Sequence, residues 1–189
     1  MPLEVTDEEI VRQTLIDKDV FAKLIMRYET KLARYLERLG VRAREDKEDI
    51  LQNAFINAYR KLNDFDLTLA FSSWMYRITH NEAMNFFRAR RIRPQVFLDE
   101  TSESLITELK DDEADTSSMA EQRLSREKLA QAIATLEPKY RDILALRFFE
   151  NRSYAEMSDI LEVPVGTVST LVHRAKKTLR ARLPNSFPI

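Results

Sequence analysis

The chain has 189 residues, of which 44% are hydrophobic and 32% are charged, and its net charge is −1. The absence of cysteine excludes disulfides and thiolate metal sites, and two glycines are too few for a Gly-rich phosphate-binding loop. No apolar run approaches the roughly 20 residues that a membrane span needs, and the first residues do not resemble a signal peptide. We therefore expect a cytoplasmic protein that does not insert into a membrane.

The first 93 residues are predicted to form one domain of four helices. Thr6 and Glu9 have the spacing of a capping box, Asp19 can cap the next helix, and Gly40 can end that helix in a left-handed conformation. Apolar residues recur at helical spacing in four stretches, which predict helices at about 7–16, 20–39, 44–62 and 71–91.

Two of these helices have faces that could bind a partner. The outer face of the third is polar except for Ile56, and such a face is usually only solvated, although it can also dock a partner helix. The fourth mixes aromatic residues with arginines, a combination that suits single-stranded DNA unless the aromatic residues only form the core. We expect an inner set of residues, Met75, Ile78 and Phe86, and an outer set, Arg77, Asn81, Arg88 and Arg91.

Helical periodicity fails after the fourth helix. Residues 94–117 begin with Pro94 and contain eight acidic residues between Asp99 and Asp115, with Lys110 as the only base among them. This composition predicts a flexible acidic linker. The fourth helix, before the linker, and the C-terminal helix, after it, are basic. The net charge of the whole chain therefore says little about the partners of each domain.

Residues 118–189 are predicted to form a second helical domain. Ser118 opens a helix to about residue 136, and Pro138 opens another to about 149. Ser153 and Glu156 form a capping box for a short helix, which is broken before Pro164. The next helix, 165–183, has six basic residues and no acid, and its expected inner residues are Val165, Val168, Leu171 and Val172. This helix-turn-helix suits the DNA major groove, although an αα-hairpin with a solvated basic face has the same pattern.

The sequence has no recognisable catalytic constellation. His80 and His173 fall in different predicted domains, and neither is accompanied by a cysteine or a Gly-rich loop. The many carboxylates fall on solvated faces or in the linker. We therefore predict a protein with no enzymatic activity, no cofactor and no metal site.

Three segments in register, 46–66, 70–93 and 140–183, resemble bacterial RNA polymerase sigma factors of the extracytoplasmic-function (ECF) group. The resemblance implies an all-α fold with a sigma region 2-like four-helix domain at 1–93 and a region 4-like helix-turn-helix domain at 118–189, joined by the acidic linker 94–117. It also implies a non-enzymatic factor that binds core RNA polymerase and directs promoter-specific initiation. A stand-alone helix-turn-helix regulator and an adaptor without a DNA role are the alternative interpretations.

The resemblance further implies a division of roles between the domains. In the family, the third helix binds the clamp helices of the polymerase β′ subunit, and the β subunit is a further contact. The fourth helix and the loop before it melt the −10 element and hold its single strand, and the C-terminal helices read the double-stranded −35 element. The linker follows the RNA path, and an anti-sigma factor commonly holds such proteins inactive.

Site residues follow from the resemblance position by position. The polymerase-binding set is Asp46, Glu48, Asp49, Gln52, Asn53 and Ile56; the −10 set is Asp66, Phe71, Trp74, Arg77, Asn81, Arg88, Arg90 and Arg91; the −35 set is Arg147, Tyr154, Thr167, Ser169, Thr170, His173, Arg174 and Lys177. The chain departs from the family pattern at Ser169 and Leu171, where Lys or Arg is frequent, and at Asn53, which replaces a common Glu.

Overall fold

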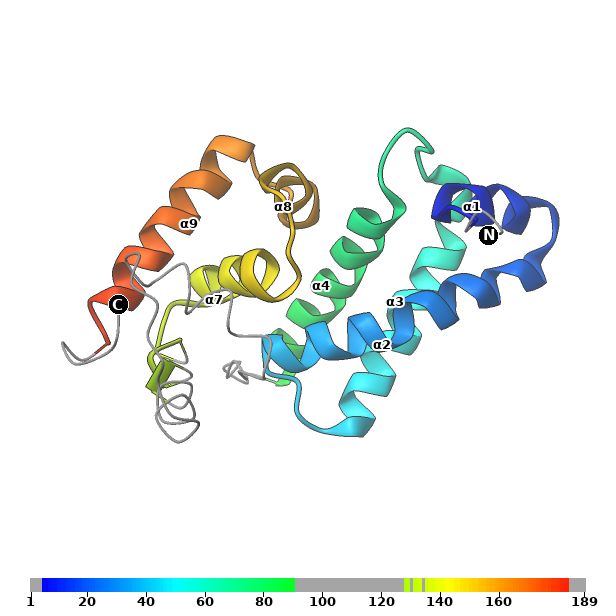
Figure 1. Ribbon diagram of the computed structural model, residues 1–189. Helices are drawn as coiled ribbons and strands as arrows, with labels where there is room; N and C mark the ends of the chain where they lie inside the picture. Colours follow the sequence, from blue (N-terminus) through cyan, green and yellow to red (C-terminus); the bar gives the residue numbers. More distant parts are fainter. Residues whose placement is uncertain (1–4, 91–127, 130, 134, 184–189) are drawn as a thin grey trace, which may run out of the picture. The chain divides into compact units, whose positions relative to one another are not determined.

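The structure is a computed structural model that describes residues 5–90, 128–129, 131–133 and 135–183 (Figure 1). The predicted linker 94–117, the Ser118 capping box and Arg91 lie outside the described residues. All regular secondary structure among the described residues is helical, as the sequence predicted. The helices form two compact units.

The first unit is built from the four helices that the sequence predicts, and their ends differ from the predicted ends by at most two residues. They are α1 (Asp7–Ile16), α2 (Phe21–Leu39), α3 (Arg44–Arg60) and α4 (Phe71–Arg90), with short 3₁₀ turns at Lys18–Val20 and Leu62–Asp64. Helix α3 packs along α4, and α1 contacts the start of α4 (Figure 1).

Local signals account for the start of α1 and the end of α2. The Thr6 hydroxyl accepts the backbone N–H of Glu9 at 3.2 Å, which is one half of the predicted capping box, while the Glu9 carboxylate contacts Arg12 and Gln13. The prediction that Asp19 caps α2 is wrong, because Asp17 caps a 3₁₀ turn and α2 begins only after that turn, at Phe21. Gly40 follows α2 with a φ of 105°, which confirms the predicted left-handed conformation.

Aromatic residues of α2 and α4 form the core of the first unit. The ring centroids of Tyr35 and Tyr76 lie 5.1 Å apart, and those of Tyr28 and Phe71 lie 5.6 Å apart. The Tyr35 hydroxyl is hydrogen-bonded to Nδ1 of His80 at 2.9 Å. Burial lowers the pKa of His80 to about 4, so this imidazole is neutral near pH 7.

The second unit contains α7 (Pro138–Leu144), α8 (Tyr154–Leu161) and α9 (Val165–Arg180). Helix α7 continues into a π-helical stretch, Ala145–Phe149. The helical segment therefore has the predicted bounds, 138–149, but its last turn is wider than an α-helical turn. The backbone N–H of Glu150 donates to the carbonyl of Ala145 at 3.1 Å, which closes this wider turn. Helix α7 packs against α9 (Figure 1).

In the helix-turn-helix, α8 begins at a capping box and ends at a residue with a left-handed backbone conformation. Both halves of the predicted Ser153–Glu156 capping box are present. Helix α8 ends at Glu162, which has a φ of 55°, and the N–H of Val163 donates to the carbonyl of Ser158 at 3.2 Å. Pro164 then precedes the first residue of α9. The break therefore depends on a left-handed turn as well as on the proline.

None of the helices in the described part of the chain is both long and apolar enough to span a membrane.

Candidate nucleic-acid interface

One face of α9 carries the residues predicted to read double-stranded DNA. Its inner residues Val168, Val172, Ala175 and Leu179 recur at helical spacing and are buried. The residues of the predicted −35 set on this helix are all exposed, namely Thr167, Ser169, Thr170, His173, Arg174 and Lys177. Helix α9 has no acidic residue, so this face has a positive electrostatic potential that favours phosphates.

The start of α9 differs in two details from the sequence prediction. Val165 was expected on the inner side, but it is the first residue of α9 and is 47% exposed. Leu171, also expected inside, is only half-buried. The Thr170 hydroxyl donates to the carbonyl of Gly166 at 2.9 Å, which fixes its orientation on the exposed face.

Arg147 and Tyr154, both predicted to touch the DNA backbone, are brought together beside the start of α8. The Arg147 guanidinium lies 5.6 Å from the centroid of the Tyr154 ring. Its Nη1 also donates to the carbonyl of Arg152 at 3.3 Å. The π-helical turn that contains Arg147 therefore directs this side chain toward the beginning of the helix-turn-helix.

In the first unit, the loop at 65–70 is ordered by its own hydrogen bonds. Asp66 Oδ1 accepts the backbone N–H of Thr68 at 2.9 Å and its hydroxyl at 2.7 Å, and these two hydrogen bonds lower the pKa of Asp66. Phe65 is buried at one end of the loop, and its ring centroid lies 4.9 Å from that of Trp74 in α4. Thr68, Leu69 and Ala70 remain exposed at the tip.

The predicted −10 residues are divided between surface and core. Asp66, Asn81, Arg88 and Arg90 are exposed, while Trp74 and Arg77 are half-buried. Phe71 is only 1% exposed, so the prediction that its side chain contacts DNA is wrong. Its ring lies between those of Tyr28, Phe65 and Trp74 and belongs to the core.

Near the end of α4, the buried aromatic residue is Phe87 and not the predicted Phe86. Phe87 is buried, while Phe86, which was expected inside, is half-buried with the Arg90 guanidinium 4.7 Å from its ring centroid. Met75 is buried as predicted, and Ile78 is half-buried. Arg88 is exposed and donates to Asn85 Oδ1 at 2.6 Å.

The predicted polymerase-binding residues form one exposed strip on α3, except for Asp46. The exposed residues are Glu48, Asp49, Gln52, Asn53 and Ile56. Ile56 is 41% exposed, and the neighbouring Tyr59 is 37% exposed. Tyr59 continues the apolar spacing of α3, so the spacing alone does not reveal this surface aromatic residue. Asp46 is half-buried because it pairs with Arg90 of α4 at 2.8 Å.

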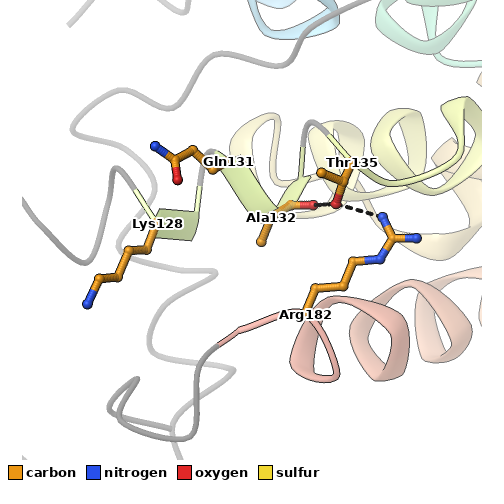
Figure 2. Close-up of a pocket in the computed structure, with 5 residues that line it drawn as sticks. All are labelled: Lys128, Gln131, Ala132, Thr135 and Arg182. Carbon is orange, nitrogen blue, oxygen red and sulfur yellow. Dashed lines mark hydrogen bonds between the residues drawn. The ribbon is translucent and has the colours of Figure 1, made fainter.

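A pocket of about 600 Å³ lies in the second unit, and the described residues that line it include none of the predicted −35 set (Figure 2). The described residues that line it are Lys128, Gln131, Ala132, Thr135 and Arg182. Arg182 Nη1 donates to the Thr135 hydroxyl at 2.7 Å, and that hydroxyl donates to the carbonyl of Ala132 at 2.7 Å (Figure 2). In the described part of the chain, no group of His, Cys, Asp or Glu side chains could hold a metal ion.

Comparisons with known proteins identify both units. Residues 24–92 match the family model "Sigma-70 region 2", and residues 126–179 match "Sigma-70, region 4". The chain is 34% identical over 175 residues to "ECF RNA polymerase sigma factor SigW" of Bacillus subtilis, and the match covers 88% of this chain and 90% of that protein.

Two solved structures have the same fold. One is "Structure of CnrH in complex with the cytosolic domain of CnrY", with a TM-score of 0.65, 22% identity and coverage of 93% of this chain and 95% of that one. The other is the sigma factor RpoE with the anti-sigma factor NepR from Bartonella quintana, with a TM-score of 0.58, 20% identity and coverage of 86% and 95%. With a relative this similar over nearly the full length of both chains, and with both sigma-70 regions in order, the chain belongs to the ECF RNA polymerase sigma factors and directs transcription initiation.

Proposed function

We propose that this sigma factor reads a promoter with its two helical domains, residues 1–93 and 118–189, while it is bound to core RNA polymerase. The observation that carries this proposal is the exposed face of α9, which has polar and basic residues and no acid. The linker 94–117 tethers the domains. The protein catalyses no reaction itself and needs no cofactor, because the polymerase supplies the chemistry.

The second domain reads the −35 element in the DNA major groove through the outer face of α9. Ser169, Thr170 and His173 are short enough for contacts with base edges, while Arg174 and Lys177 can reach bases or phosphates. Thr167 contributes at the start of the same face. Arg147 and Tyr154 hold the phosphate backbone beside α8, which fixes the register of α9 in the groove.

The first domain holds the single-stranded −10 element along the 65–70 loop and α4. Trp74 supplies an aromatic surface for an unpaired base, and Arg77, Arg88, Arg90 and Arg91 supply charge for the phosphates. Asn81 and Asp66 are the polar groups that can recognise a base. The loop is suited to this role because the Asp66–Thr68 hydrogen bonds order its backbone and leave its tip exposed.

The exposed strip of α3 binds the clamp helices of the polymerase β′ subunit. Its acidic residues Glu48 and Asp49 can pair with basic residues of the partner, and Gln52 and Asn53 can form neutral hydrogen bonds. Ile56 and Tyr59 add exposed apolar surface at the end of the strip, where a hydrophobic contact would be buried on binding. The further proposed partners of this protein are the polymerase β subunit and an anti-sigma factor. The solved structure of RpoE, which has the same fold, includes an anti-sigma factor.

The test is run-off transcription from a promoter library, with core polymerase alone and with core polymerase plus the purified protein. Selective initiation from a subset of promoters supports the proposal, and the selected promoters give the −10 and −35 sequences. Initiation that does not depend on the added protein would contradict it. Tight binding to a two-fold symmetric duplex without polymerase would instead identify a stand-alone regulator.

A further inference from the structure

We propose that α1 positions the 65–70 loop and the start of α4 for −10 DNA, and that Glu8 is the residue through which it acts. This inference rests on the proposed role of the loop and α4 in holding single-stranded DNA. It assigns a function to a helix for which the sequence predicted none.

The start of α4 has no cap in its own sequence. The preceding residue, Ala70, has a methyl side chain that cannot accept a hydrogen bond, and the first turn of α4 has no acidic residue. The first backbone N–H groups of a helix have no acceptor within the helix, and they carry a partial positive charge. A side chain from another element can therefore stabilise this end considerably.

Glu8 of α1 supplies that side chain. Its Oε1 accepts the backbone N–H of Phe71, the first residue of α4, at 3.3 Å. Glu8 is half-buried, so water screens the interaction less than it would at an open surface. A carboxylate at this position stabilises the start of a helix in the same way as an N-terminal cap residue does.

The residue next to Glu8 attaches α1 to α2, so that Glu8 itself is held in place. Asp7 accepts hydrogen bonds from the Tyr28 hydroxyl and from the Arg27 guanidinium. The Tyr28 ring packs edge-on against Phe71, with the centroids 5.6 Å apart. Phe71 is therefore held by α1 through its backbone and by α2 through its ring.

Phe71 transmits this constraint to both ends of the loop. Its ring centroid lies 5.6 Å from that of Phe65, where the loop begins, and 5.6 Å from that of Trp74, in the first turn of α4. A carboxylate that contacted DNA directly would repel phosphates. Glu8 is therefore suited to hold the protein backbone and not to contact phosphates, because its carboxylate accepts the N–H of Phe71.

The test measures how the full-length protein, bound to core polymerase, binds a fluorescent single-stranded oligonucleotide with the non-template −10 sequence of a library-selected promoter. We expect Glu8→Ala to weaken this binding by about fivefold, the factor that corresponds to loss of one helix cap. Glu8→Gln keeps an oxygen acceptor and should restore most of the affinity. Glu9→Ala is the matched control, because the Glu9 carboxylate contacts Arg12 and Gln13 within α1.

Each outcome has a distinct meaning. If the wild-type complex does not bind the oligonucleotide, the proposed −10 role is wrong. If the wild type binds and Glu8→Ala binds equally well or more tightly, the role of Glu8 is wrong. Affinity for core polymerase and for a −35 duplex should be unchanged in Glu8→Ala, so a parallel loss in all three would indicate general destabilisation and would overturn the proposal.

Discussion

Arg90 of α4 and Asp46 of α3 form an ion pair with a distance of 2.8 Å between Nη1 and Oδ1. The sequence predicted separate roles for them, with Arg90 on DNA and Asp46 on polymerase. The Asp46 side chain is 18% exposed and that of Arg90 is 52% exposed, so the carboxylate lies beneath a guanidinium that still reaches solvent. Arg90 also lies over the Phe86 ring, with its guanidinium carbon 4.7 Å from the ring centroid.

Removal of the Asp46 charge should strengthen binding of single-stranded −10 DNA. In Asp46→Asn the positive charge of Arg90 is no longer neutralised, while stability should change by less than about 1 kcal/mol because the pair is partly exposed. Oligonucleotide binding measured across a salt series should show a gain that is largest at low salt. Arg90→Gln should abolish the gain in the double variant. Glu45→Gln, an exposed residue in the same turn, is the control, and an equal gain there would contradict a specific pairing.

Arg174→Ala should weaken binding of a −35 duplex and reduce its salt dependence. If Arg174 contacts one phosphate, the slope of log K against log salt concentration should fall by about 0.9. Fluorescence anisotropy with the holoenzyme at several salt concentrations gives this slope. An unchanged slope with an altered base preference would mean that Arg174 reads a base edge. Lys18→Ala, an exposed cation of the first unit, should leave the slope unchanged.

Gly166→Ala should stabilise the protein and weaken −35 binding. A Cβ at Gly166 would meet no atom within 4 Å, so alanine fits the free protein and should add about 0.5–1 kcal/mol from its better helix propensity. The same methyl group would lie on the exposed start of α9, where DNA is expected to approach closely. Thermal unfolding and duplex binding together test both parts, and unchanged duplex affinity would contradict the close approach.

Substitution of the other glycine by alanine should have the opposite effect on stability. Gly40 has a φ of 105°, a conformation that is unfavourable for alanine, so Gly40→Ala should lower the melting temperature.

His80 should make the protein less stable in mildly acidic solution. Its folded pKa of about 4 lies below the ordinary value of 6.5, so the unfolded chain binds the proton more readily. The contribution of His80 to stability is therefore complete above about pH 6.5 and is lost as the pH falls toward 4, and this residue alone should account for a loss of about 2 kcal/mol between pH 7.5 and pH 5. Chemical unfolding at the two pH values, compared between the wild type and a variant without the imidazole, measures this contribution.

A variant isolates this contribution from other titrating groups. Burial raises the pKa of Asp142 to about 7, so Asp142 favours folding more at low pH and opposes the effect of His80. His80→Gln cannot titrate, so on acidification its stability should fall less, or rise more, than that of the wild type. An identical pH dependence in the two proteins would show that His80 is not buried in its neutral form.

Helix positions and the exposed face of α9 could be predicted because their signals are local. The Ser153–Glu156 capping box and the apolar spacing of Val168 and Val172 each depend on residues a few positions apart. Most of the α3 strip was found in the same way. Such signals do not depend on how the helices pack.

The errors concern residues whose environment is set by another helix. Phe86 and Phe87 are adjacent, so either could continue the apolar stripe of α4, and the packing of α4 against its neighbours buries Phe87. Phe71 has an aromatic side chain of the type that stacks on unpaired bases, but its ring packs against those of Tyr28 and Phe65. The Asp46–Arg90 pair joins residues far apart in the sequence and leaves no periodic signal.

Because Ala145–Phe149 forms a π-helical turn, the orientation of Arg147 relative to α8 depends more on the number of residues in this segment than on their identity. A π turn has one more residue than the α turn that it replaces. Deletion of a single residue after Arg147 would let the segment become α-helical and would rotate the side chains before the deletion by about 100° relative to α8. Arg147 would then point away from Tyr154. Among related chains, gaps between α7 and α8 should therefore be rarer than substitutions.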